Sequence, residues 1–141
     1  MSKIDISDDQ IKNIVEITEG HPFYTQHLCY VIWDLAQKEQ KIDSTDIQGA
    51  LEIVLKREAY TYISIWNNLT LNQHKLLKCL AMEYAQKNNY SAEYLSITGL
   101  KTVSSLQRAY EVLLKKDIID RYANGYYIQD RFFKMWVKKL V

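Results

Sequence analysis

The sequence predicts a mainly α-helical protein that carries two short β-strands near its C-terminus. Apolar residues recur at helical spacing along most of the chain, and helix-starting signals stand before several of these segments. A strand-like pattern occurs near residues 118–128, around an Asn-Gly pair. With 141 residues, of which 48% are hydrophobic, the chain can bury the core of one ordinary domain or of two small ones.

The first half of the chain predicts three or four helices. A capping box, Ser7-Asp8-Asp9-Gln10, opens the first, because the Ser and Gln side chains satisfy each other's backbone amides. Gly20 suits the end of this helix, and Pro22 suits the first turn of the next, which we expect to end near residue 38. Another helix begins at Asp43 or Ser44. The apolar positions at helical spacing are Ile11, Ile14, Val15, Thr18, Tyr24, Leu28, Val31, Ile32, Leu35, Ile47, Leu51, Val54 and Leu55.

The second half begins with another run of helices. Thr70-Leu71-Asn72-Gln73 is a second capping box, and the apolar pattern after it predicts a helix. A short helix follows over residues 91–97, and after Gly99 a further helix runs from Thr102 to Lys116.

A hairpin and a final helix complete the prediction. Residues 118–122 and 126–128 flank Asn124-Gly125, which is a strong signal for a tight β-hairpin. Asp130 is placed to cap a last helix. Helix, short helix, helix and hairpin is the order of a winged helix-turn-helix. We therefore expect a helical module over residues 1–68 and a winged helix over residues 69–141.

Charge divides along the same boundary. Residues 1–68 hold six Lys and Arg against eleven Asp and Glu, whereas residues 69–141 hold twelve against six. The overall charge of +1 therefore conceals a net −5 and a net +6. A basic half can face an anionic partner, although ordinary solvated surfaces produce the same asymmetry.

Three segments resemble the C-terminal part of the archaeal-type STAND ATPases, relatives of the AAA+ proteins that also occur in bacteria. They are ITEGHPFYTQHLCYVIWD at 17–34, IWNNLTLNQHKLLKCLA at 65–81 and YYIQDRFFKMWVKKL at 126–140, and their order matches the family. The resemblance implies a helical lid followed by a winged helix. The sequence has no Gly-rich loop ending in Lys-Ser/Thr and no apolar strand ending in paired acids, so the ATPase core is missing. Met1 is then expected to be an added start residue.

The resemblance also implies a nucleotide contact. In this family the Gly-x-Pro corner of the lid lies against the bound nucleotide, which assigns that role to Gly20, His21 and Pro22. ATP with magnesium is expected for a full-length parent, and no cofactor for this fragment. Glycine permits close backbone approach, and a proline at a helix start presents an apolar edge beside a positive dipole end. The plain alternative is a corner between two helices without any ligand.

If the winged helix binds DNA, the helix over 102–116 is its recognition helix. Its first turns would face base edges, and basic residues around it would meet phosphates. The electrostatic contribution is modest, because Glu111 would repel phosphates and the first two turns carry a single Arg. Winged helices also dock proteins, and a solvated basic face explains the same pattern. The candidate residues are Lys101, Ser104, Ser105, Arg108, Lys115, Lys116 and Arg121.

The sequence gives little support for a metal site, a catalytic site or a membrane span. His21, His27 and Cys29 do not converge on one side of a helix, which argues against a metal site or a Cys-His nucleophile. No paired carboxylates stand out as an acid and a base, so we expect no catalytic residues and no metal. Because the phosphate-binding loop is missing, we expect no enzyme activity from this fragment, although a full-length parent would be an ATPase. Cys29 and Cys79 lie in apolar helical patterns and are expected to be small buried hydrophobes in a reducing cytoplasm. The longest apolar run, LCYVIW, is too short to span a membrane, and no signal peptide precedes it.

Three functional hypotheses follow. In the first, the chain is the regulatory and coupling end of an ATPase, whose core would lie in the same polypeptide and whose winged helix meets DNA or a protein. In the second, it is a free-standing DNA-binding regulator. In the third, it is a protein interaction module, for which an exposed apolar patch around Trp33 or Trp136 would be the main evidence.

Overall fold

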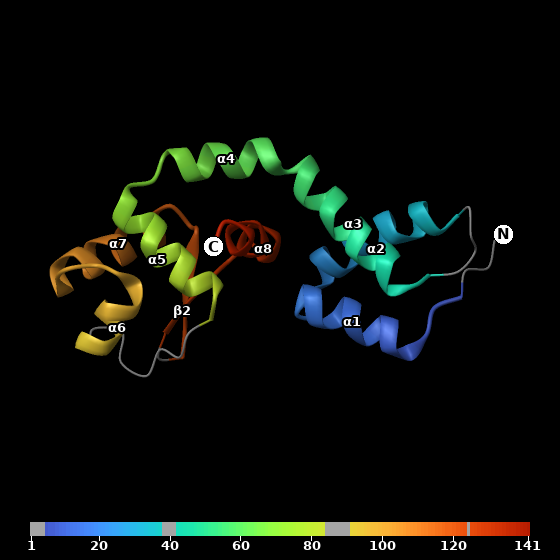
Figure 1. Cartoon of the computed structure of the whole chain (residues 1–141), viewed down its shortest axis with the longest axis horizontal. Coiled ribbons are helices and arrows are strands. Elements are labelled where there is room, and N and C mark those ends of the chain that lie inside the picture. Colours follow the sequence, from blue (N-terminus) through green and yellow to red (C-terminus); the bar gives the residue numbers. More distant parts are fainter. Residues whose placement is uncertain (1–4, 38–41, 84–90, 124) are drawn as a thin grey trace. The chain divides into compact units, whose positions relative to one another are not determined.

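The computed structural model describes residues 5–37, 42–83, 91–123 and 125–141, which form two compact units (Figure 1). One lies within residues 5–59 and the other spans Tyr60–Val141. In the described part of the chain, the structure is mainly helical with a small antiparallel hairpin near the C-terminus, which confirms the predicted fold class.

The first unit is built from three helices. The middle helix, α2, packs against both α1 and α3, so that one apolar core forms among the three. This core contains Ile14, Leu28, Val31, Ile32, Ala36, Ile42, Ile47, Ala50, Leu51, Val54 and Leu55. The helices are α1 (Asp8–Thr18), α2 (Pro22–Ala36) and α3 (Ser44–Arg57).

Capping boxes fix where α1 and α3 begin, the first as predicted and the second found in the structure. Ser7 Oγ accepts a hydrogen bond from the Gln10 backbone N–H at 3.2 Å, and Gln10 Oε1 accepts one from the Ser7 N–H at 2.9 Å. Asp43 and Asp46 form a second reciprocal pair at the start of α3, with bonds of 3.1 and 3.0 Å. The Gln10 side-chain amide also donates to the Ile42 carbonyl, which ties the start of α1 to the segment that leads into α3.

Several apolar residues of α1 and α2 are exposed, in contrast to the prediction. Ile11, Val15 and Leu35 belong to the apolar pattern, yet they lie at the surface. Cys29 was expected to be buried and is also exposed, whereas Cys79 is buried as predicted, and both are free thiols. The reason is that α1 and α3 cover only one side of α2, while α2 is apolar around most of its circumference.

The second unit is arranged around one central helix. That helix, α5, contacts α6, α7, α8 and strand β2. The unit also includes α4, which the sequence interpretation had grouped with the helical module that ends at residue 68. Its elements are α4 (Ala59–Asn67), α5 (Leu71–Ala81), α6 (Ala92–Thr98), α7 (Val103–Lys115), β1 (Ile119–Tyr122), β2 (Gly125–Ile128) and α8 (Arg131–Lys139).

An aromatic cluster joins α4 to α5 and α8. The Tyr62 ring lies 5.3 Å from that of Phe133 and 5.9 Å from that of Trp136. Trp66 stacks on His74 at 3.9 Å with the rings almost parallel, and His74 Nε2 lies 2.7 Å from the Trp66 carbonyl oxygen. Trp66 of segment 65–81 and Phe133 and Trp136 of segment 126–140 therefore belong to one aromatic cluster.

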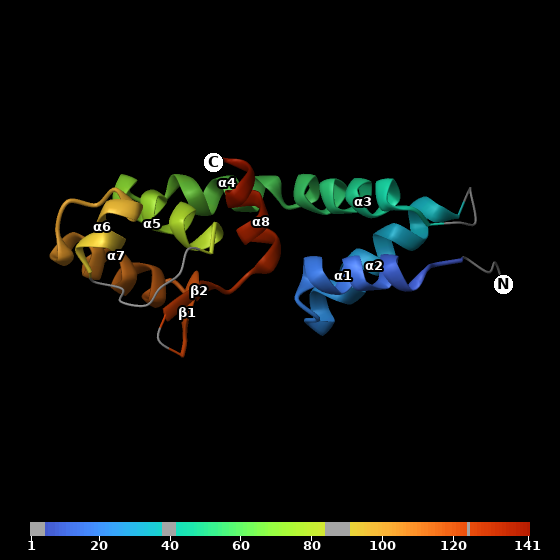
Figure 2. The same ribbon diagram turned by 60° about the horizontal axis from the view of Figure 1, so that its bottom comes forward.

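The hairpin projects beyond the helices of its unit (Figure 2). Its register pairs Ile119 with Ile128 and Tyr122 with Gly125, so the strands reach as far as Tyr122 and Gly125. The sequence had placed the turn at Asn124-Gly125. Gly125 instead belongs to β2, and Ala123 takes the left-handed conformation at φ 48°. Asn124 lies outside the described residues.

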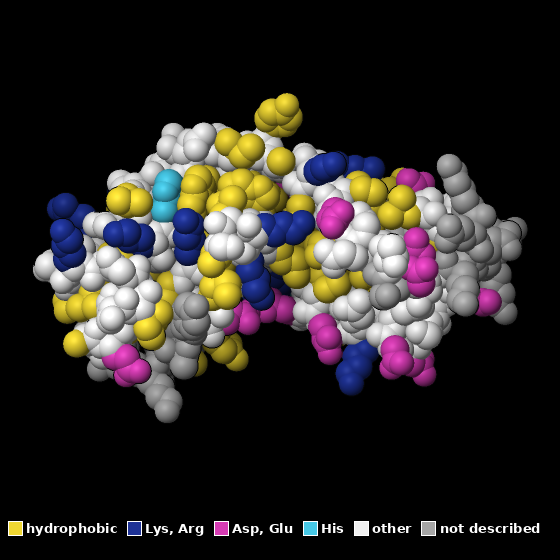
Figure 3. All heavy atoms as spheres, in the orientation of Figure 1, with side chains coloured by type: hydrophobic (Ala, Val, Ile, Leu, Met, Phe, Trp, Pro, Cys, Tyr) yellow, Lys and Arg dark blue, Asp and Glu magenta, His cyan; other side chains and the backbone are white. Residues whose placement is uncertain are grey.

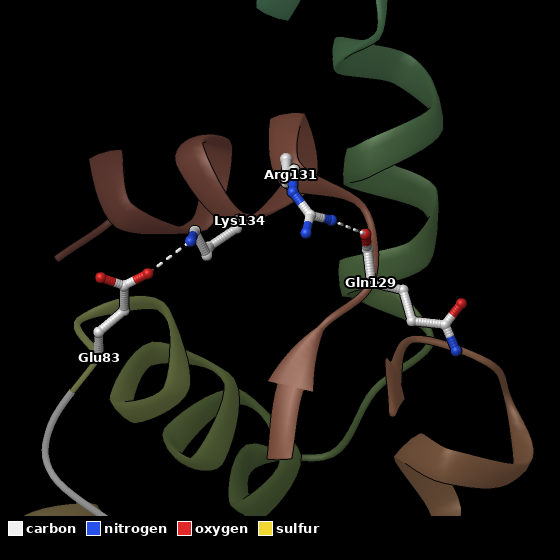
Figure 4. Close-up of polar contacts among 4 residues, drawn as sticks. All are labelled: Glu83, Gln129, Arg131 and Lys134. Atoms are coloured by element: carbon white, nitrogen blue, oxygen red, sulfur yellow. Dashed lines mark hydrogen bonds and ion pairs between the residues drawn. The ribbon is translucent and has the colours of Figure 1, made fainter. Parts of the chain in front are cut away.

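Polar contacts hold the last helix against the rest of the unit (Figure 4). Asp130 Oδ1 accepts hydrogen bonds from the backbone N–H groups two and three residues further on, at 2.9 and 3.1 Å, so Asp130 caps α8 as predicted. Arg131 Nη1 donates to the Gln129 carbonyl at 3.4 Å. Lys134 Nζ lies 2.5 Å from Glu83 Oε1, which links α8 to the end of α5.

Candidate functional site

Helix α7 presents its polar residues on one exposed face. Ser104, Arg108, Glu111 and Lys115 are exposed and stand at i, i+4, i+7 and i+11, which puts them in one row along the helix. The opposite face is buried and contains Leu106, Ala109, Tyr110 and Leu113. We call Ser104, Arg108, Glu111 and Lys115 the polar stripe.

A groove runs beside this stripe. Its volume is about 660 Å³, and it lies between α7 and the first turn of α5. Six of its ten lining residues have a hydroxyl or an amide side chain, and one Arg and one Glu also line it. Thr70 and Asn72 belong to the lining although they were not among the predicted site residues, because only the tertiary fold brings α5 beside α7. The lining residues are Thr70, Asn72, Gln73, Ser104, Ser105, Gln107, Arg108, Ala109, Glu111 and Val112.

Four of the predicted DNA-contacting residues lie outside the groove. Lys101 is exposed before α7, and Lys115 is exposed in its last turn. Lys116 ends α7, and its Nζ donates to the Asn68 carbonyl at 3.5 Å. Arg121 is exposed on β1. The structure therefore brings Ser104, Ser105 and Arg108 together at the groove and distributes the remaining cations around it.

The hairpin has two chemically different faces. Arg121 pairs in register with Tyr126, so both lie on the same face of the two-stranded sheet. Tyr126 stacks on Tyr110 of α7 with 4.0 Å between ring centroids. The face that carries Arg121 is thus the one turned toward α7, whereas Asp120 and Tyr122 occupy the other face.

The second unit is basic, but its cations are spread out. On the face shown in Figure 3, Lys and Arg side chains are scattered over this unit and do not merge into a continuous band. Glu111 also stands within the polar stripe, between Arg108 and Lys115. Contact with a phosphate backbone would therefore rest on a few separated cations, and its electrostatic contribution would be modest.

The backbone at the Gly-His-Pro corner turns through two left-handed residues and makes two hydrogen bonds back to α1. Glu19 and Gly20 both take the left-handed conformation, at φ 54° and φ 70°, and this ends α1. The Gly20 N–H donates to the Val15 carbonyl and the His21 N–H to the Thr18 carbonyl, both at 3.1 Å. These bonds use carbonyl groups that the end of a helix would otherwise leave without a partner.

The same corner is exposed at the start of α2. His21 occupies the N-cap position but makes no side-chain capping hydrogen bond, and Pro22 occupies the first turn. The His21 ring lies 4.8 Å from the Tyr24 ring. The Phe23 ring lies edge-on to the Tyr24 ring, with 5.2 Å between the ring centroids. Inside the corner, Thr18 Oγ1 lies 2.9 Å from the hydroxyl oxygen of Thr25. Gly20, His21 and Pro22 are thus together at the surface.

Among the described residues, no group of three or more His, Cys, Asp or Glu side chains is placed to hold a metal ion. Partial burial raises the pKa of the Cys29 thiol. Burial also raises the pKa of the Cys79 thiol, whose Sγ donates to the Tyr94 hydroxyl at 3.8 Å. Both effects disfavour a reactive thiolate.

No helix in the described part of the chain has the length and apolar character needed to cross a membrane.

A comparison with protein families agrees with the architecture of the second unit. A family model described as a probable winged helix domain matches residues 60–139. Comparisons with curated proteins and with solved structures gave no match. The matched residues run from α4 to α8 and cover nearly all of the second compact unit. The chain belongs to this family of winged helix domains.

Proposed function

We propose that this chain is the C-terminal coupling part of a STAND-type ATPase. In this proposal the first unit acts as the lid, and Gly20, His21 and Pro22 contact a nucleotide that a separate core domain holds. The winged helix unit passes the movement of the lid to DNA or to a protein. The observation that carries the proposal is the exposed start of α2, where the N-cap residue His21 makes no side-chain capping hydrogen bond.

The corner has the chemistry that such a contact needs. The first N–H groups of a helix have no partner within the helix, and its N-terminus favours negative charge. Pro22 adds an apolar edge beside these groups, and the residue before His21 is a glycine. Because the sequence has no phosphate-binding loop, we expect this chain alone to bind ATP weakly.

The genomic DNA upstream of the Met1 codon tests the proposal directly. Translated in the same frame, it should encode a Gly-rich loop that ends in Lys-Ser or Lys-Thr, followed by an apolar strand that ends in paired acids. A ribosome-binding site immediately before the Met1 codon, with no open frame upstream, would contradict the proposal.

A second candidate is DNA binding by the winged helix alone, and the polar stripe of α7 favours it. Arg108 and Lys115 would contact phosphates, and Ser104 near the start of α7 would face base edges. Fluorescence anisotropy with a random duplex, at low and raised salt, tests this role. Replacing either cation by Ala should reduce the slope of log affinity against log salt by about 0.9, whereas Lys56→Ala in the first unit should leave it unchanged. Absence of binding at tens of micromolar protein in low salt would exclude DNA as a partner.

A further inference from the structure

Helix α2 has an unusual composition for a helix at a surface. Its 15 residues include one Asp and no Glu, Lys or Arg. One side of the helix supplies Leu28, Val31 and Ile32 to the core of the first unit. A helix with so few charged residues is normally covered on more than one side. The described residues of the first unit leave a second side of α2 exposed, on which Gln26 and Asp34 stand among large aromatic side chains.

Three large aromatic side chains lie on that second side. Phe23 is 63%, Tyr30 67% and Trp33 48% exposed. Their spacing of i, i+7 and i+10 puts them on the same side of the helix, opposite Leu28 and Ile32. We call these three residues the aromatic stripe. A single exposed aromatic residue needs no explanation, but several on one helix side are typical of a protein interface, in which Trp and Tyr contribute most to affinity.

The exposed charged residues of α1 and α2 are mostly acidic, and Asp34, four residues after Tyr30, lies on the same side of α2 as the aromatic stripe. Glu16, Glu19 and Asp34 are exposed on α1, at the corner and on α2, and Asp8 and Asp9 are exposed at the start of α1. Among the described residues of α1 and α2, Lys12 is the only Lys or Arg. Exposed aromatic faces attract Lys and Arg side chains, and nearby carboxylates strengthen this preference.

We propose that the aromatic stripe binds an amphipathic helix of a protein partner, one whose apolar face is flanked by Lys and Arg. The stripe supplies the apolar contact, and the surrounding carboxylates select a basic partner over an acidic one. A nucleic acid or a second copy of this acidic face would meet like charge. The inference does not depend on whether α7 binds DNA. Tyr30 and Trp33, which carry its test, lie about two and three helical turns along α2 from the corner that the proposed function assigns to a nucleotide.

Two labelled peptides of about 14 residues provide the probe, one with Leu and Lys and the other with Leu and Glu in the same amphipathic pattern. Fluorescence anisotropy with the full chain should show binding of the Leu/Lys peptide. The Leu/Glu peptide should bind at least about tenfold more weakly. Trp33→Ser and Tyr30→Ser should each weaken binding of the Leu/Lys peptide by about tenfold. Tyr60→Ser is the matched control, because Tyr60 is 89% exposed in the second unit, and it should leave binding unchanged.

Three results would overturn the inference. The first is an equal affinity of the chain for the two peptides. The second is an affinity for the Leu/Lys peptide that neither Trp33→Ser nor Tyr30→Ser changes. The third is self-association in sedimentation velocity that Trp33→Ser abolishes, because a second copy would then be the partner. Circular dichroism of each variant establishes that it is folded. Should Trp33→Ser unfold the first unit, the more exposed Tyr30 still provides the test.

Discussion

Helices α2 and α7 both pack one apolar side into a core, but their exposed sides differ, because that of α7 is mainly polar and that of α2 carries large aromatic residues. Each buries one apolar side in the core of its own unit. On its free side α7 exposes Ser104, Arg108 and Glu111, whereas α2 exposes Phe23 and Trp33. The comparison teaches that the buried side of a helix defines the fold, whereas the exposed side indicates the class of partner.

The largest expected effects come from the two cores. Leu28 and Leu113 are each fully buried, one in each unit. Replacing either by Ala should lower the free energy of unfolding of its own unit by about 2–5 kcal/mol, because a cavity remains. Urea unfolding followed by tryptophan fluorescence separates the units, since Trp33 lies in the first and Trp66 and Trp136 lie in the second. A shift of both transitions together by either variant would show that the two cores are not independent.

Helix caps should have the next largest effect. Asp130 accepts two backbone N–H groups at the start of α8, whereas Asp43 accepts one at the start of α3. Asp130→Ala should lower the free energy of unfolding of the second unit by about 1–2 kcal/mol, and Asp43→Ala should lower that of the first by about 1 kcal/mol. Asp130→Asn is the control, because the amide oxygen can still accept both bonds. Equal losses from Asp130→Asn and Asp130→Ala would point to charge rather than to capping.

A third substitution tests the polar stripe from its acidic member. If α7 meets phosphates, Glu111→Gln should strengthen binding of a random duplex by about two- to fivefold at low salt, because it removes a repulsive charge. The gain should decline as salt is raised. Glu52→Gln, on exposed α3 surface, should have no effect on the same titration. A gain of equal size from Glu52→Gln would indicate a change in overall charge rather than a contact at α7.

The smallest effect concerns the contact between Glu83 and Lys134. The hydrogen bond and charge of Lys134, with a further charge from Lys138, lower the pKa of Glu83. A carboxyl whose pKa is lower in the folded state adds stability above its unfolded pKa, and this stability is lost as the pH falls through the folded pKa. The Glu83 side chain is 59% exposed, so solvent screening limits the effect to below about 1 kcal/mol.

Urea midpoints at pH 7 and pH 3 measure this contribution. Glu83→Gln should lower the midpoint of the second unit at pH 7 and leave it nearly unchanged at pH 3. Asp117→Asn, an exposed substitution after α7, is the control, because Asn tolerates the left-handed backbone of that position. An equal loss at both pH values from Glu83→Gln would show that the contact does not depend on the carboxylate charge.

Local signals predicted where the helices begin. The capping pairs that start with Ser7 and Thr70, and the single caps Thr102 and Asp130, all lie where the sequence placed them. Each of these caps forms its hydrogen bonds within three residues of itself, so a short segment of sequence is enough to predict it. For the same reason helical spacing could predict that Ser104, Arg108 and Lys115 share one side of α7.

Features that depend on distant residues could not be predicted in the same way. Because α2 is apolar on most sides, its periodicity does not indicate which side α1 and α3 cover, and Cys29 and Leu35 were therefore misplaced. Thr70 and Asn72 line the groove only because α5 packs against α7. In the hairpin the strand register, rather than the Asn-Gly signal, determined the turn, with Ala123 in the left-handed position.

The central claim is that the two units present separate surfaces for different partners. A crossed titration tests it most directly, with the wild-type chain, Trp33→Ser and Arg108→Ala each titrated with a random duplex and with the Leu/Lys peptide. We predict that Arg108→Ala weakens duplex binding alone and that Trp33→Ser weakens peptide binding alone. If either substitution weakens both ligands to the same extent, α2 and α7 do not have separate partners and the account is wrong.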